Sequence, residues 1–256
     1  MHELSTIVAP SALASRIGEL RVLDCRSGPD AHARYLERHL AGALYVDLER
    51  DLSGDGSRPE RGGRHPLPPL ATWCRTLGRL GIDPSTPVVL YDHAGGANAA
   101  ARAWWMLRAV GHREVAVIDG GLAAAIAAGL PVESGEARVD PKPPYPASAW
   151  ARPTLDIDAV ARLARDPSWR LVDVRAPERY RGEREPIDPI AGHIPGAHNI
   201  PLTENLGPDG RFKSPGELRA LYEARLGDPA RTIVSCGSGV TACHTLLALE
   251  HAGLVG

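Results

Sequence analysis

The chain has 256 residues, a formal net charge of −2 and four cysteines. This charge balance gives no basic footprint for nucleic acid, and the cysteines lack the paired spacing of a metal site or the number that a disulfide framework needs. No apolar run approaches the roughly 18 residues of a membrane helix, and residues 1–20 lack the pattern of a secretion signal. We therefore expect a cytoplasmic protein of one large or two medium domains.

An internal repeat divides the chain into two copies. The matching segments are 22–26 with 171–175, 39–43 with 193–197, 52–56 with 206–210, and 88–92 with 232–236. The difference in residue number between a segment and its match is larger for the second pair than for the first, which places an insertion in the second copy between Arg175 and His193. Asp92 of the first copy stands where the second copy has Cys236, so only the second copy carries a nucleophile.

Each copy alternates short apolar or β-branched runs with helical patterns, beginning with a strand at 22–24, a helix at 31–40 and a strand at 44–46. This alternation predicts an α/β fold, with a parallel sheet and helices on both faces in each copy. A proline-rich stretch follows the first copy and predicts an extended linker. The expected domains are 1–135 (non-catalytic), a linker at 136–153, and 154–256 (catalytic).

The segment 235–242 reads S-C-G-S-G-V-T-A between an apolar strand at 232–234 and a helical stretch at 243–251. A sulfur placed where a strand turns into a helix N-terminus faces unpaired backbone N–H groups and the positive end of the helix dipole, which favour a thiolate. Cys236 is therefore the predicted nucleophile. We expect Cys25, Cys74 and Cys243 to be buried packing residues. Cys243 is expected to lie a helical turn or more inside the helix that follows the loop.

Attack of this thiolate on the sulfur of a small donor would give an anionic persulfide. Backbone N–H groups of the loop would stabilise that anion as a nest does, and its glycines let the backbone approach closely. The loop residues assigned to binding are Gly237, Gly239, Val240, Thr241 and Ala242, with Ser238 offering a hydroxyl. A donor with a carboxylate also needs a cation, and the insertion supplies Arg179, Arg181 and Arg184.

The tandem copies, the H-I-P-G-A stretch at 193–197, the Trp104–Trp105 pair and the C-G-S-G-V-T-A loop resemble the two-domain rhodanese superfamily. Within it the loop is most similar to that of 3-mercaptopyruvate sulfurtransferases, whereas thiosulfate-using rhodaneses typically carry basic residues just after the cysteine. The resemblance implies an inactive N-terminal domain, a catalytic C-terminal domain and a cleft between them.

The resemblance also implies roles for single residues. Ser238 would handle the proton of the donor thiol or the charge of the pyruvate enolate, and His65 stands at the position of a histidine that works with this serine. Glu49 falls where the family has an aspartate. Arg179 matches the substrate-binding arginine of the pattern R-[FY]-x-G, whereas a second family arginine is replaced here by Asp188, so that a second cation must come from Arg184 or elsewhere.

In that superfamily a further strand lies beside the one that leads to the cysteine. The first copy has it, at 114–119, followed by a helix to Ala128, whereas the second copy ends three residues after Gly253. We therefore expect the second domain to lack its last strand and helix, which would leave an unpaired strand edge in a fragment or in a weakened domain.

These observations predict a sulfurtransferase that moves sulfane sulfur from 3-mercaptopyruvate through a Cys236 persulfide to thioredoxin, another thiol or cyanide, releasing pyruvate. No metal or organic cofactor is expected, because the protein itself carries the sulfur. Thiosulfate is the alternative donor, and a non-enzymatic binding module is the alternative of another class. A phosphatase is excluded because its C-x5-R loop would need an arginine at Ala242. A metal site of Cys236, Cys243 and His244 fails on spacing.

Four polar residues recur in both copies although only one copy has a nucleophile. They are Asp24 with Asp173, at strand ends, and His39 with His193. Because these residues recur in a copy that has no nucleophile, we expect a structural role for all four.

Overall fold

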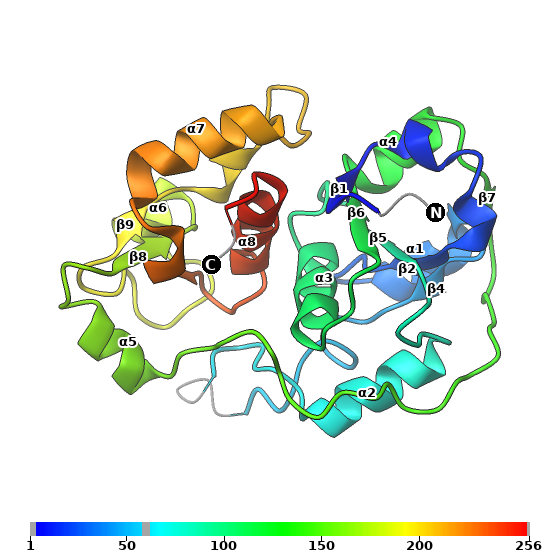
Figure 1. Ribbon diagram of the computed structural model, residues 1–256, viewed down its shortest axis with the longest axis horizontal. Helices are drawn as coiled ribbons and strands as arrows, with labels where there is room; N and C mark the ends of the chain where they lie inside the picture. The colour runs from blue at the N-terminus through cyan, green and yellow to red at the C-terminus, as the bar shows by residue number, and fades with distance from the viewer. Residues whose placement is uncertain (1–3, 58–61, 255–256) are drawn as a thin grey trace.

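The computed structural model describes residues 4–57 and 62–254. Figure 1 shows two α/β units joined by an extended segment. The strands of the first unit are β1 (Ile7–Val8), β2 (Arg21–Asp24), β3 (His39–Leu40), β4 (Leu44–Tyr45), β5 (Val88–Tyr91), β6 (Val115–Ile118) and β7 (Val132–Glu133). Its helices are α1 (Ala31–Glu37), α2 (Leu70–Arg79), α3 (Ala99–Ala109) and α4 (Gly121–Ala127), with 3-10 turns η1 (Pro10–Leu13) and η2 (Ile17–Glu19).

The second unit has fewer strands. These are β8 (Arg170–Asp173), β9 (His198–Asn199) and β10 (Thr232–Ser235). Its helices are α5 (Ile157–Leu163), α6 (Pro177–Tyr180), α7 (Pro215–Leu226) and α8 (Ala242–His251), with 3-10 turns η4 (Leu202–Asn205) and η5 (Pro229–Arg231). The predicted α/β class is confirmed. The outer ends of the two predicted domains, residues 1–3 and 255–256, lie outside the described residues.

The first sheet is parallel in the order β1-β6-β5-β2-β4. Successive side chains of a strand point to opposite faces, so Leu23 and Leu90 join one apolar cluster while Val22 and Val89 join another. The first cluster includes residues of α2 and α3, and the second includes Ala125 of α4. The sheet is therefore covered on both faces, as short apolar strands in a parallel sheet require.

The second sheet is parallel in the order β10-β8-β9, which repeats the order β5-β2-β4 of the first. Ser235 pairs with Asp173 as Tyr91 pairs with Asp24, so the two copies agree in register. Whereas β5 lies between two strands, β10 has a strand neighbour on one side only in the part of the chain that the structure describes. All four residues of β10 are half-buried, while those of β5 are buried.

The segment 134–156 joins the two units and runs along the first. Its backbone is held by α2, with Lys142 N donating to Gly78 O (2.8 Å) and Tyr145 N donating to Cys74 O (2.9 Å). A Cβ on Gly78 would lie 2.7 Å from the carbonyl oxygens of Lys142 and Pro143, so this close approach depends on a glycine. The linker is thus a strap that packs on the first domain, with Tyr145 buried.

The two domains meet along α3 and α8, which lie side by side in Figure 1. Cys243 and Leu247 of α8 belong to the same apolar cluster as α3 of the first domain. The beginning of α8, and the cysteine loop that leads into it, are therefore placed against the first domain. Among the described residues, no helix is both long and apolar enough to cross a membrane.

Candidate active site

Cys236 directly follows β10, and residues 237–241 lead from it into α8. Its Sγ accepts a hydrogen bond from the backbone N–H of Gly239 at 3.1 Å. Gly239 has a φ of +75°, the left-handed conformation that glycine adopts without strain. Cys236 is half-exposed while the other three cysteines are buried, so its sulfur is the one that a small molecule can reach.

The equivalent loop of the first domain shows what this strand–loop–helix unit does for an anion. Asp92 is fully buried, and its carboxylate accepts four backbone N–H groups. The donors are Ala94 (2.8 Å), Gly96 (2.8 Å), Asn98 (3.1 Å) and Ala100 (3.2 Å). The loop after β5 is therefore an anion cradle already filled by a side chain, and Cys236 stands at the corresponding place after β10.

The other residues of this segment differ in burial. Val240 and Ala242 are buried, whereas Ser238 and Thr241 are half-buried. Cys243 donates its S–H to Gly239 O at 3.3 Å, and burial raises its pKa to about 11, so it stays a thiol. The expectation that Cys243 lies a turn or more inside the helix is wrong, because α8 begins at Ala242.

Arg179, in the short helix α6, lies beside the cysteine loop. A Cβ on Gly237 would lie 3.4 Å from Arg179 Nη2. The guanidinium donates to Glu185 (2.7 and 3.1 Å), and Nη2 also donates to Asp188 Oδ2 at 3.1 Å. Hydrogen bonds from Arg179 lower the pKa of Glu185 to about 2, so Glu185 is a permanent counter-ion of this arginine.

A second arginine at this point comes from the first domain. Arg64 donates from Nε to Asp188 Oδ1 at 2.8 Å, and a Cβ on Gly237 would lie 2.8 Å from Arg64 Nη2. The sequence predicted that a second cation comes from Arg184 or elsewhere, and it did not single out Arg64, which directly precedes His65. Arg181 of the insertion is instead bound by Glu183, at 2.6 and 2.8 Å.

The loop that carries Arg64 also carries His65. The Nε2 of His65 lies 2.9 Å from Glu49 Oε1, so these two predicted residues are brought together. His65 Nδ1 is buried without a hydrogen-bond partner among the described residues. A Cβ on Gly63 would lie 3.7 Å from Ser238 Cα, which places this loop against the cysteine loop.

Arg102 of α3 ties the two loops together, and no sequence pattern marks it. Its Nη1 donates to Gly239 O at 3.1 Å, and its Nη2 donates to His65 O at 3.1 Å. The side chain is buried at the domain interface, with a relative exposure of 5%. Nη2 also donates to Leu52 O at 3.4 Å, so Arg102 is held within the first domain and its bond to Gly239 O links the cysteine loop to that domain.

The recurrent histidines have matching surroundings in the two copies. His39 Nδ1 lies 2.7 Å from Tyr35 O and its ring stacks on Tyr35, whereas His193 makes the same two contacts with Tyr180. The hydroxyls of the two tyrosines donate to Ala43 O and Ala197 O respectively. These contacts hold the chain that follows α1 in the first copy and α6 in the second.

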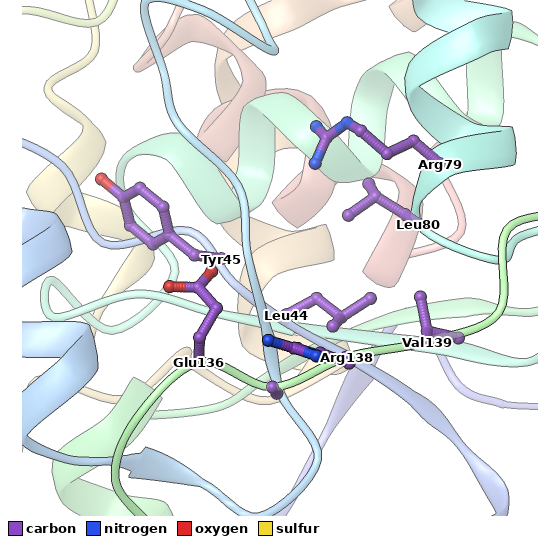
Figure 2. Close-up of a pocket in the computed structure, with 8 residues that line it drawn as sticks. Leu44, Tyr45, Arg79, Leu80, Glu136, Arg138 and Val139 are labelled. Atoms are coloured by element: carbon purple, nitrogen blue, oxygen red, sulfur yellow. The ribbon is translucent and has the colours of Figure 1, made fainter.

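A hollow of about 250 Å³ lies elsewhere, between α2, β4 and the strap (Figure 2). It is lined by Leu44, Tyr45, Arg79, Leu80, Glu136, Ala137, Arg138 and Val139. Arg79 already binds Asp51 at 2.7 Å. No residue of the cysteine loop lines this hollow, and we assign it no part in the chemistry of Cys236.

Comparison with known proteins identifies the two halves of the chain. The family described as Rhodanese-like domain matches residues 9–128 and 156–255. A probable 3-mercaptopyruvate sulfurtransferase of Pseudomonas aeruginosa is 46% identical over 260 residues, covering 96% of this chain and 89% of the relative. A putative thiosulfate sulfurtransferase of Mycobacterium tuberculosis is 42% identical, covering 91% and 82%. The structure of 3-mercaptopyruvate sulfurtransferase from Leishmania major superposes with a TM-score of 0.86 at 32% identity, covering 98% of this chain and 70% of that one.

Proposed function

This chain belongs to the rhodanese family, and we propose that it is a sulfurtransferase that accepts sulfur from 3-mercaptopyruvate onto Cys236. One observation carries the proposal. The accessible sulfur of Cys236 receives a backbone N–H in a loop whose counterpart in the first domain encloses a carboxylate. A site of this kind stabilises a small anion that is attached to the protein at its centre.

The reaction has two steps. The Cys236 thiolate attacks the donor's sulfur, an S–S bond forms, and the donor's C–S bond breaks with its electron pair passing to carbon as the pyruvate enolate. The enolate takes a proton and leaves as pyruvate. In the second step the thiolate of an acceptor attacks the outer sulfur, and Cys236 leaves as a thiolate ready for another cycle.

Other residues of the site have proposed parts in these steps. Ser238 would pass the donor's thiol proton to the enolate carbon, and His65, held by Glu49, would assist it through its unpartnered ring nitrogen. Arg179 would bind the donor's carboxylate, and the backbone of residues 237–242 would hold the persulfide. The acceptor would be thioredoxin, another small thiol or cyanide, in a reducing compartment such as the cytoplasm, where four free cysteines persist.

Thiosulfate is the second candidate donor, because the Mycobacterium tuberculosis relative is a putative thiosulfate sulfurtransferase. Thiosulfate would leave sulfite after the same attack, and the arginines beside Gly237 suit either anion. The absence of basic residues between Cys236 and Ala242 favours 3-mercaptopyruvate.

The test is to incubate the purified chain with each donor separately and to weigh the intact protein. A gain of one sulfur, about 32 Da for a persulfide, from 3-mercaptopyruvate together with release of pyruvate supports the proposal. The same gain from thiosulfate alone would transfer the assignment to the second donor. No gain from either would leave a non-enzymatic binding role.

A further inference from the structure

Three charged side chains meet above the residue that follows Cys236. A Cβ on Gly237 would lie 2.8 Å from Arg64 Nη2, 3.0 Å from Asp188 Oδ2 and 3.4 Å from Arg179 Nη2. Arg64 comes from the first domain, while the other two come from the insertion of the second. The two domains therefore contribute one cation each to the same point.

The carboxylate of Asp188 lies between these two cations. Oδ1 accepts from Arg64 Nε at 2.8 Å, and Oδ2 accepts from Arg179 Nη2 at 3.1 Å. Each oxygen of Asp188 thus accepts from a different arginine, and the two arginines belong to different domains. This arrangement shows that one carboxylate fits between the two guanidiniums, beside Gly237 of the cysteine loop.

The side chains of Glu185, Asp188 and Arg64 differ in how far they are exposed. Glu185 is nearly buried, with 4% of its side chain exposed, and it binds both Arg179 and Arg175. Asp188 is 22% exposed and Arg64 is 31% exposed. An incoming anion can therefore reach and replace Asp188, whereas Glu185 stays with Arg179 and fixes its orientation.

From this geometry we infer that Arg64 and Arg179 together bind the carboxylate of the sulfur donor, and that Asp188 occupies their site until the donor displaces it. The identity of this ligand rests on the proposed function. When the donor displaces Asp188, the Nε–H of Arg64 and one N–H of Arg179 Nη2 become free. These two N–H groups then donate to the donor's carboxylate in the way that they donate to Asp188. Because Arg64 belongs to the first domain, the donor site is complete only when both domains are in place.

The first measurement needs no sulfur transfer. Cys236 is alkylated with iodoacetate, an anion, and with iodoacetamide, its neutral counterpart, and the ratio of the two rates reports the anion site beside the sulfur. The three other cysteines are buried, so the modified peptide identifies Cys236. Arg64→Ala should lower the ratio about tenfold and Asp188→Asn should raise it severalfold, in keeping with the strength of charge-assisted hydrogen bonds.

Arg181→Ala is the matched control, because this arginine lies in the same insertion but is bound by Glu183. Its ratio should equal that of the wild type. An unchanged ratio in Arg64→Ala, or a lower ratio in Asp188→Asn, would overturn the inference.

The second measurement is steady-state turnover with 3-mercaptopyruvate. Arg64→Ala should raise KM roughly tenfold to a hundredfold with a smaller change in kcat, and Asp188→Asn should lower KM. Equal KM values in Arg64→Ala and the wild type would contradict the inference while leaving the sulfurtransferase intact. If the wild type forms no persulfide with any donor, the proposed function fails instead, and the alkylation ratios still decide whether Arg64 and Asp188 form an anion site.

Discussion

Asp92 and Cys236 occupy the same place in two copies of one strand–loop–helix unit. Each follows a strand whose parallel neighbour ends at an aspartate in the same register, with Tyr91 opposite Asp24 and Ser235 opposite Asp173. The carboxylate of Asp92 accepts four backbone N–H groups of its loop, whereas the sulfur of Cys236 accepts the backbone N–H of Gly239. We propose that the first copy uses this loop for stability and that the second copy uses it for chemistry.

Replacing Cys236, the proposed nucleophile, gives the most direct prediction. Cys236→Ser should abolish persulfide formation with every donor and leave the fold intact, because the hydroxyl is similar in size but cannot carry a sulfane sulfur. Intact-mass measurement after incubation with donor checks the first part, and circular dichroism checks the second. Cys243→Ser serves as a comparison, since Cys243 is a buried thiol and that variant should still gain the sulfur. A sulfur adduct above background in Cys236→Ser would contradict the mechanism.

The bonds between the Asp92 carboxylate and its loop should stabilise the first domain. In Asp92→Asn one carboxylate oxygen becomes an NH2 group that faces N–H donors, so we expect a loss of about 2–4 kcal/mol in the free energy of unfolding. Thermal unfolding measures this loss. Asp140→Asn, in an exposed part of the strap, should have no such effect. Sulfur transfer per folded molecule should be unchanged in both variants, and a marked fall for Asp92→Asn would show that the first cradle takes part in the reaction.

Arg102 should act as a positioning residue, because it touches the loops and not the reacting sulfur. Arg102→Met removes the bonds to Gly239 O and His65 O, and should lower kcat about tenfold to a hundredfold with little change in KM. Arg102→Lys should restore part of the loss.

A second arginine of the same helix supplies the control for Arg102. Arg108 pairs with Glu250 across the domain interface at 2.9 Å without touching either loop. Arg108→Met should therefore lower stability and leave kcat unchanged. Equal kcat values for Arg102→Met and the wild type would remove Arg102 from the site.

His244 should make the protein sensitive to mild acid. Burial lowers its pKa from 6.5 to about 3 in the folded state, so below pH 6.5 the unfolded chain binds a proton that the folded chain does not. The effect of His244 on the free energy of unfolding is therefore absent above pH 6.5. Below that, it lowers the free energy of unfolding as the pH drops toward 3, by about 2 kcal/mol at pH 5.

The melting temperature measured between pH 7 and pH 5 tests this dependence on His244. His244→Gln keeps a polar side chain that can accept from Asn205 Nδ2, which donates to His244 Nδ1 at 3.1 Å. The variant should lose that part of the pH dependence. The same slope in both proteins would assign it to other groups.

The sequence alone predicted the two-copy α/β fold and placed Cys236 at a strand end before a helix. These features depend on neighbours in the chain: the alternation of apolar runs, the small residues of the loop and the recurrence of the same segments. It also brought Arg179, His65 and Glu49 into consideration, and the structure puts the last two in contact. Their catalytic roles, and the exact domain limits, stay predictions.

What the sequence left open was how the domains meet. Arg64 and Asp188 are 124 residues apart, and Arg102 and Gly239 are 137 apart, yet both pairs lie within hydrogen-bond distance. No local pattern marks such pairs, because they arise from the packing of one domain against the other and not from the conformation of either segment. The local sequence determined that Cys236 follows a strand and precedes a helix, and only the tertiary structure decided that Arg64 of the first domain lies beside Gly237.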